Sequence, residues 1–207
     1  MSKTRESYHH GDLRKALIEA GEAVLADTGR AGFSLRQVAR KVGVSHSAPA
    51  HHFGDTNGLL AALATEAFRR FIVMMEDRQR DATDDPREQL LASGLGYLDF
   101  AASSPALFRL MFGEECIDPM TDELAKVSQA AFLHLARDTE RLCGASPFDD
   151  PRVMARVMAI WSLVHGFAEL QIFGLARFQG AMEERGRDQL FRQALLPLMA
   201  PIEAGER

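Results

Sequence analysis

Two short helical segments that follow each other almost without a loop constrain this chain more than any other feature. The first begins at Ser34, whose hydroxyl can cap free backbone amides while Gln37 completes a capping box, and it ends at Gly43. Ser45 is then expected to cap the next helix only two residues after that glycine. Because so short a turn cannot fully reverse the chain, we expect the two helices to cross steeply, as in a helix-turn-helix.

The rest of the sequence also indicates helices. β-Branched residues are scattered through stretches rich in Ala, Leu, Arg and Glu, and few runs alternate with period two. An apolar stripe with three- or four-residue spacing predicts a helix before the pair, closed by Gly29. We therefore predict an all-α chain with helices over 11–28, 34–43, 45–53, 56–80, 85–100, 105–112, 121–143, 150–176 and 187–199.

Charge is distributed unevenly along the chain. The 207 residues have a formal net charge of −5, but residues 1–54 carry eight basic and five acidic side chains and so have a net charge of +3. Such asymmetry is typical of a small module that faces a polyanion and a larger part that faces something else. We expect a DNA-binding helix-turn-helix domain over 1–54 and a helical-bundle domain over 55–207, to which the family resemblance described below assigns effector binding and dimerisation.

Several classes of protein are disfavoured. The two cysteines form no CxxC pattern, no run approaches about 18 consecutive apolar residues, and the first residues lack an apolar signal core, so we expect a cytoplasmic protein without membrane contact. No phosphate loop, GxSxG elbow or HExxH motif occurs, and adjacent histidines on a helix point about 100° apart. The sequence predicts no enzyme, no cofactor and no metal site.

Two parts of the sequence resemble the tetracycline-repressor (TetR) family of bacterial one-component regulators. Residues 8–21 and 34–63 resemble the family's DNA-binding domain, with a capped bracing helix, a glycine turn, a valine-serine cap and a short reading helix that ends in His-Phe. Residues 105–113, with Trp161, His165 and Gly166, resemble the regulatory domain of the subclass named for its Trp, His and Gly. The resemblance implies a repressor that binds a palindromic operator as a homodimer and is released by a small, largely apolar effector.

The segment 45–53 has almost no large apolar side chain before Phe53, so most of its surface must face solvent or a partner. Its small and polar side chains suit base edges, thymine methyl groups and phosphates, although a His-His pair can be merely a polar surface and a serine merely a cap. The candidate DNA contacts are Tyr8, His9, His10, Ser34, Arg36, Ser45, His46, Ser47, Ala48, Ala50, His51, His52 and Thr56.

Three positions depart from the family pattern. Ala50 stands where an aromatic residue commonly packs on the phosphate backbone, and Thr56 stands where a lysine often contacts a phosphate. Fewer cationic contacts predict a shallower dependence of DNA affinity on salt. Pro49 lies four residues after Ser45 and lacks a backbone N–H, so we expect it to weaken the first turn of the reading helix.

The inner faces of the second domain are apolar and aromatic, which usually means packing. A few polar groups, among them Cys116, fall within these stripes and favour an apolar hollow with placed polar contacts, while a core histidine bonded to a carbonyl remains the alternative for His165. The candidate effector contacts are Tyr97, Phe100, Phe108, Met111, Phe112, Met158, Trp161 and His165.

One reading helix contacts only half of a two-fold symmetric operator, so the resemblance implies a dimer. Apolar stripes on the last two helices could pair into a four-helix arrangement, although a stripe can equally face its own domain. The candidate interface residues are Leu163, Phe167, Leu170, Leu190, Phe191, Leu195 and Leu198. A non-regulatory architectural or protein-interaction module built on the same helices is the alternative function.

Overall fold

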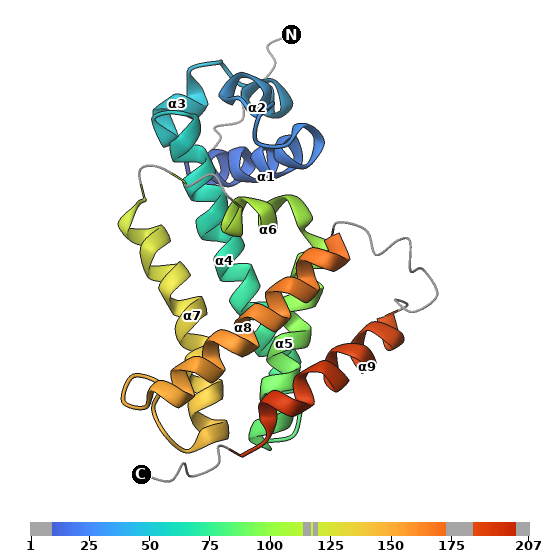
Figure 1. The fold of residues 1–207 in the computed structure, drawn as a ribbon. Helices are drawn as coiled ribbons and strands as arrows, with labels where there is room; N and C mark the ends of the chain where they lie inside the picture. The colour runs from blue at the N-terminus through green and yellow to red at the C-terminus, as the bar shows by residue number, and fades with distance from the viewer. Residues whose placement is uncertain (1–9, 114–116, 118–119, 173–183, 202–207) are drawn as a thin grey trace. The chain divides into compact units, whose positions relative to one another are not determined.

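The computed structural model describes residues 10–113, 117, 120–172 and 184–201, and among these residues it contains helices and no strand. The all-α prediction is confirmed. The helices are α1 (His10–Thr28), α2 (Leu35–Val42), α3 (Ala48–Phe53), α4 (Thr56–Arg80), α5 (Pro86–Ser103), α6 (Pro105–Phe112), α7 (Asp122–Cys143), α8 (Pro151–Ile172) and α9 (Glu184–Leu195), followed by a 3-10 turn over Leu196–Met199 (Figure 1).

The chain divides into two compact packing units. The first comprises residues 1–67 and 106–125, and the second comprises residues 68–105 and 126–207. Helices α4 and α7 each contribute residues to both units. These units describe packing, so the division of function at residue 54 stays a prediction.

In the first unit, α2 packs against both α1 and α3. The predicted apolar stripe of α1 is confirmed, because Leu17, Ala20 and Val24 are buried. Val38 of α2 and Leu59 at the start of α4 are buried as well. Burial of these side chains supplies the hydrophobic free energy that holds the short helix α2 in place.

The predicted start and end of α2 are confirmed. The backbone N–H of Gln37 donates to the Ser34 hydroxyl at 3.4 Å, and that hydroxyl donates to Oε1 of Gln37 at 2.7 Å. Gly43 ends the helix with φ of 78°, a left-handed conformation that suits glycine because it has no Cβ.

The predicted start of α3 at Ser45 is wrong, because the helix begins at Ala48. The Ser45 carbonyl instead accepts the Ala48 N–H at 3.0 Å in the turn before the helix. Pro49 occupies the first turn, where a backbone N–H has no intrahelical acceptor and where the fixed φ of proline suits a helix. The expectation that Pro49 weakens the first turn is wrong for the same reason.

In the second unit, α5 packs against α8 and α9, and α8 also packs against α9. The α4 and α5 backbones approach closely at Gly96, where a Cβ would lie 2.5 Å from the Met74 carbonyl oxygen. Side chains from several helices are fully buried in this unit, including Leu98, Phe100 and Phe191.

The predicted ends of the later helices agree with the structure in most cases, but α5 ends at Ser103, three residues later than predicted. Asp85 caps α5 and accepts the Arg87 N–H at 2.8 Å, while Glu88 in the first turn binds the Arg192 guanidinium at 2.9 and 3.0 Å. Helix α9 begins three residues earlier than the expected Arg187. The predicted end of α8 near 176 lies outside the described residues.

Candidate functional site

Helix α3 and the turn before it present most of their predicted DNA contacts to solvent. Ser45, His46, Ser47, Ala50 and His51 are exposed, and Ala48 and His52 are half-buried. Pro49 is buried and so faces the packing unit rather than solvent. The short helix therefore has one anchored position and an outward surface of small and polar side chains, as a reading helix requires.

The end of α3 is fixed against α1 and closed before α4. The guanidinium of Arg14 in α1 lies 5.3 Å from the centre of the Phe53 ring, which is a cation–π distance. Gly54 donates its backbone N–H to the Ala50 carbonyl at 2.8 Å. The carboxylate of Asp55 accepts the Gly58 N–H at 2.8 Å and caps α4, so Thr56 is the first residue of that helix.

The other predicted DNA contacts differ in how available they are. Arg36 on α2 is exposed, whereas the Ser34 hydroxyl is half-buried and engaged with Gln37, so a phosphate contact from Ser34 would compete with the helix cap. Tyr8, His9 and the side chain of His10 lie outside the described residues.

In the second unit, the structure brings two of the predicted effector contacts into direct contact. The hydroxyl of Tyr97 on α5 lies 2.7 Å from Nδ1 of His165 on α8. The centre of the Phe71 ring on α4 lies 4.8 Å from that of Tyr97 and 5.4 Å from that of Phe100. Trp161, one turn before His165, lies 5.9 Å from the ring of Phe132.

The environment of this pair determines its proton positions. Burial raises the pKa of Tyr97 above its ordinary value, so the phenol stays protonated. Burial also lowers the pKa of His165, although the Glu169 carboxylate opposes that change, so the imidazole is neutral at pH 7. The Glu169 carboxylate lies 3.9 Å from Nε2 and favours the imidazole proton on that atom, which leaves Nδ1 to accept the hydrogen bond from Tyr97.

The remaining predicted effector contacts do not form one group. Phe108, Met111 and Phe112 belong to α6 in the first unit, where the Phe108 and Phe112 rings lie 5.0 Å apart. Phe100 and Phe108 are fully buried, which favours a packing role for both. Met158 is exposed, and Cys116 lies outside the described residues.

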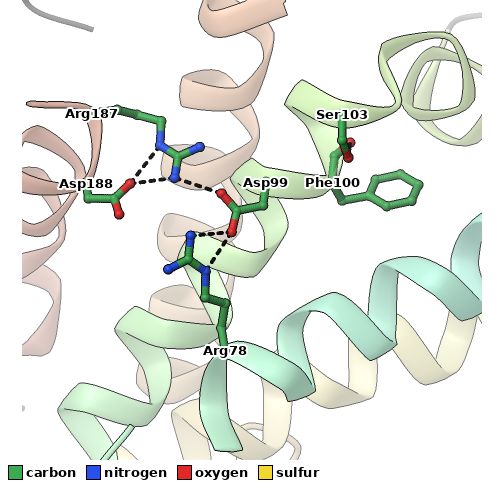
Figure 2. Close-up of polar contacts among 6 residues, drawn as sticks. All are labelled: Arg78, Asp99, Phe100, Ser103, Arg187 and Asp188. Carbon is green, nitrogen blue, oxygen red and sulfur yellow. Dashed lines mark hydrogen bonds and ion pairs between the residues drawn. The ribbon is translucent and has the colours of Figure 1, made fainter. Parts of the chain in front are cut away.

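Sequence reasoning missed the charged residues around an open pocket of about 580 Å³ in the second unit. Asp99 of α5 accepts hydrogen bonds from Arg78 of α4 and Arg187 of α9 (Figure 2). These partners lie 21 and 88 residues from Asp99 along the chain, so no local spacing signals the cluster. Among the described residues, no group of three or more His, Cys, Asp or Glu could hold a metal ion.

The candidate interface residues divide by burial. Phe191 and Leu195 are fully buried and contact their own protomer, with the Phe191 ring 5.6 Å from that of Phe167. Leu170 and Leu190 are exposed, and Leu163, Phe167 and Leu198 are half-buried. The exposed and half-buried residues are therefore the ones available to a second protomer.

Helix α8 has a higher mean hydropathy than its short runs of consecutive apolar residues indicate. Within the described residues it is long and apolar enough to cross a bilayer by length and composition alone, with mean hydropathy of 1.3. Polar residues such as Ser162 and His165 interrupt the apolar runs without lowering the mean far. Only 28% of its most apolar stretch is fully buried in the protomer, while most of its other apolar residues are half-buried and Met158 and Leu170 are exposed.

Comparisons with known proteins agree with this arrangement. The family described as "Bacterial regulatory proteins, tetR family" matches residues 17–63, and "Tetracyclin repressor-like, C-terminal domain" matches residues 90–198. The HTH-type transcriptional regulator BetI of Stenotrophomonas maltophilia is 30% identical over 150 residues, which cover 70% of this chain and 75% of that protein.

Solved structures show the same fold. A Rhodococcus sp. RHA1 protein of unknown function is 26% identical, with a TM-score of 0.75 and coverage of 94% of this chain and 97% of that one. A TetR variant from Acinetobacter baumannii AYE in complex with minocycline is 21% identical, with a TM-score of 0.55 over 93% and 95% of the chains. The chain belongs to the TetR family of bacterial transcriptional regulators.

Proposed function

We propose that this regulator is a cytoplasmic repressor that binds a palindromic operator as a homodimer and releases it when a small, largely apolar effector binds. The observation that carries the proposal is the two-sided character of α3 and the turn before it, in which Pro49 is buried while His46, Ser47 and His51 are exposed. Such a helix can enter the major groove with its outward residues at base edges, while Arg36 contacts the phosphate backbone.

Dimerisation through α8 and α9 is part of the proposal. A symmetric operator requires two reading helices, and a homodimer supplies them by two-fold symmetry. The support is the exposed apolar side chains of these helices, Met158 and Leu170 on α8 and Leu190 on α9, together with the half-buried Leu163 and Phe167 of α8. Burial of these side chains between two protomers would provide the association free energy.

The effector response is assigned to the second unit. Trp161, His165 and Gly166 resemble the residues for which one subclass of regulatory domain is named, and the hydrogen-bonded Tyr97 and His165 offer a polar group beside an aromatic cluster. An effector that favours the conformation with lower DNA affinity shifts the population toward it, with a coupling free energy of about 1–3 kcal/mol. A protein of the same fold has been crystallised with minocycline, a small molecule.

The decisive experiment is selection of bound sequences from a random DNA pool, followed by affinity measurements on the selected site and on scrambled DNA. We expect a palindrome that binds at least about 1000-fold more tightly than scrambled DNA. His51→Ala should weaken the selected site, whereas Arg137→Ala on an exposed part of α7 serves as the control. Equal affinity for all sequences would support an architectural DNA-binding role instead.

A further inference from the structure

The open pocket in the second packing unit is a candidate ligand site that is distinct from the Tyr97–His165 pair. Its volume of about 580 Å³ lies within the range of sites that take small molecules. Its lining comes from α4, α5, α8 and α9 and includes Met74, Arg78, Asp99, Ala102, Gln171 and Arg187. None of these residues is among the effector contacts expected from the sequence.

The charged part of the lining holds two arginines and one carboxylate. Nε and Nη2 of Arg78 both lie 2.6 Å from Oδ2 of Asp99, and Nη2 of Arg187 lies 2.8 Å from Oδ1 of the same carboxylate (Figure 2). Asp188, which is not part of the lining, also binds Arg187, at 2.7 Å from Nε. The two arginines and two carboxylates therefore balance in formal charge, and what the lining offers a ligand is the unused part of a guanidinium.

Arg187 is a buried cation, and one amino group of its guanidinium is available to a ligand. Its side chain is only 7% exposed, and although burial disfavours the charged form, hydrogen bonds from the guanidinium to Asp188 and Asp99 outweigh that effect and raise its pKa. Those contacts use Nε and Nη2, and among the described residues Nη1 takes part in none of them. A planar guanidinium with an available amino group is well suited to a carboxylate.

Gln171 adds a buried acceptor to the same pocket. Its Oε1 atom is buried and accepts no hydrogen bond from the part of the chain that the structure describes. A buried carbonyl oxygen without a donor costs free energy, which a ligand hydroxyl or N–H would recover. Met74 and Ala102 supply carbon surface between the polar groups.

We propose that this pocket binds a small organic acid. Its carboxylate binds Nη1 of Arg187, a hydrogen-bond donor on the ligand binds Oε1 of Gln171, and its apolar part lies against Met74 and Ala102. The identification of this organic acid as the effector rests on the proposed function. Binding itself is independent of DNA, so the test below uses the DNA-free protein, and a failure to select operator DNA would not be mistaken for failure of the pocket.

The first test compares three probes by titration calorimetry on the full chain: 3-hydroxyoctanoate, octanoate and the neutral octanamide. We expect 3-hydroxyoctanoate to bind most tightly and octanamide at least about tenfold more weakly than octanoate, because it lacks the charge that Arg187 recognises. Equal binding of octanoate and octanamide, or no binding by any probe up to about 10 mM, would overturn the proposal.

The second test locates the site with variants whose folding is checked by circular dichroism. Arg187→Gln should weaken octanoate binding at least about tenfold, and Gln171→Leu should remove the preference for 3-hydroxyoctanoate over octanoate. Ala102→Trp fills the pocket without changing its charges and should also abolish binding, which keeps the test valid if Arg187→Gln fails to fold.

The matched control is Arg192→Gln, because Arg192 also joins α9 to a carboxylate of α5, Glu88, but does not line the pocket. We expect this variant to bind octanoate as the unmodified protein does. If Ala102→Trp binds octanoate normally, or if Arg192→Gln weakens binding as much as Arg187→Gln, the carboxylate is not recognised in this pocket and the proposal fails.

Discussion

The Tyr97 hydroxyl donates a hydrogen bond of 2.7 Å to Nδ1 of His165 and so holds a neutral imidazole in one tautomer. Because this bond stabilises the neutral form, Tyr97→Phe should raise the pKa of His165 and lower the free energy of unfolding by about 1 kcal/mol. An NMR titration of the imidazole resonances and a urea unfolding curve measure the two effects. An unchanged titration of His165 would show that the hydrogen bond is not formed in solution.

The same pair is expected to separate effector response from DNA binding. Trp161→Ala combined with His165→Ala should impair release of operator DNA by effector, because it removes an aromatic wall and a polar contact, while operator affinity without effector stays within about threefold. The measurement is DNA binding with and without an effector identified by screening. Loss of operator affinity in the absence of effector would contradict this division of labour.

Asp138 on α7 provides a prediction for stability against pH. Burial raises its pKa above the ordinary 3.8, although nearby His134 and hydrogen bonds from Ser93 and Gln79 oppose the shift. Since the folded state binds the proton more tightly than the unfolded state, stability falls as the pH rises from 3.8 through the raised value.

Asp138→Asn removes that titration and keeps the size of the side chain. We expect the free energy of unfolding of the variant to exceed that of the unmodified protein by an amount that grows as the pH rises above 3.8 and then levels off. Denaturant unfolding between pH 3.5 and pH 8 measures the difference, with about 1 kcal/mol per unit of pKa shift as the scale. A difference that grows toward low pH would contradict the predicted sign.

Two glycines give a matched test of packing in the second unit. A Cβ at Gly96 would lie 2.5 Å from the backbone oxygen of Met74, so Gly96→Ala should destabilise by about 1–3 kcal/mol or more. A Cβ at Gly166 on α8 would meet no atom within 4 Å, so Gly166→Ala should be neutral or stabilise the helix by up to about 1 kcal/mol. Thermal unfolding of both variants decides whether α4 and α5 approach as closely as the structure shows.

The salt dependence of DNA binding can be tested at the first residue of α4. Thr56→Lys would restore a cation where related sequences often place a phosphate contact, so we expect the slope of log affinity against log salt to steepen by about 0.9. Fluorescence anisotropy at several salt concentrations measures the slope, with Arg137→Lys as a charge-preserving control. An unchanged slope would show that residue 56 does not contact a phosphate.

Features with local causes were predicted well from the sequence. The cap at Ser34 and the left-handed glycine at Gly43 depend on neighbours within four residues, and the structure confirms both. The predicted start of α3 was wrong because Pro49, which favours the first turn of a helix, determines the start more strongly than a possible cap at Ser45.

Features that depend on tertiary packing could not be predicted. The link between Asp99 and Arg187 spans 88 residues, and burial of Phe191 depends on space at Gly94, where a Cβ would lie 2.6 Å from the phenyl ring. An apolar stripe on α9 looks the same in sequence whether it faces its own protomer or a partner. Tertiary contacts therefore determine what each apolar face packs against, and the spacing of apolar residues in the sequence does not reveal them.

The buried proline of α3 has a consequence for how easily this regulator could change its target. Because Pro49 and the Arg14–Phe53 contact hold the helix from its inner side, substitutions at Ala50 or His51 would alter the outward chemistry without disturbing the attachment. Under the proposed function, the side chains that read DNA and the side chains that attach the helix are different residues of one six-residue helix. We therefore expect new operator preferences to be accessible by exchanging one or two outward residues, which makes this short segment a practical starting point for building sensors that bind other DNA sequences.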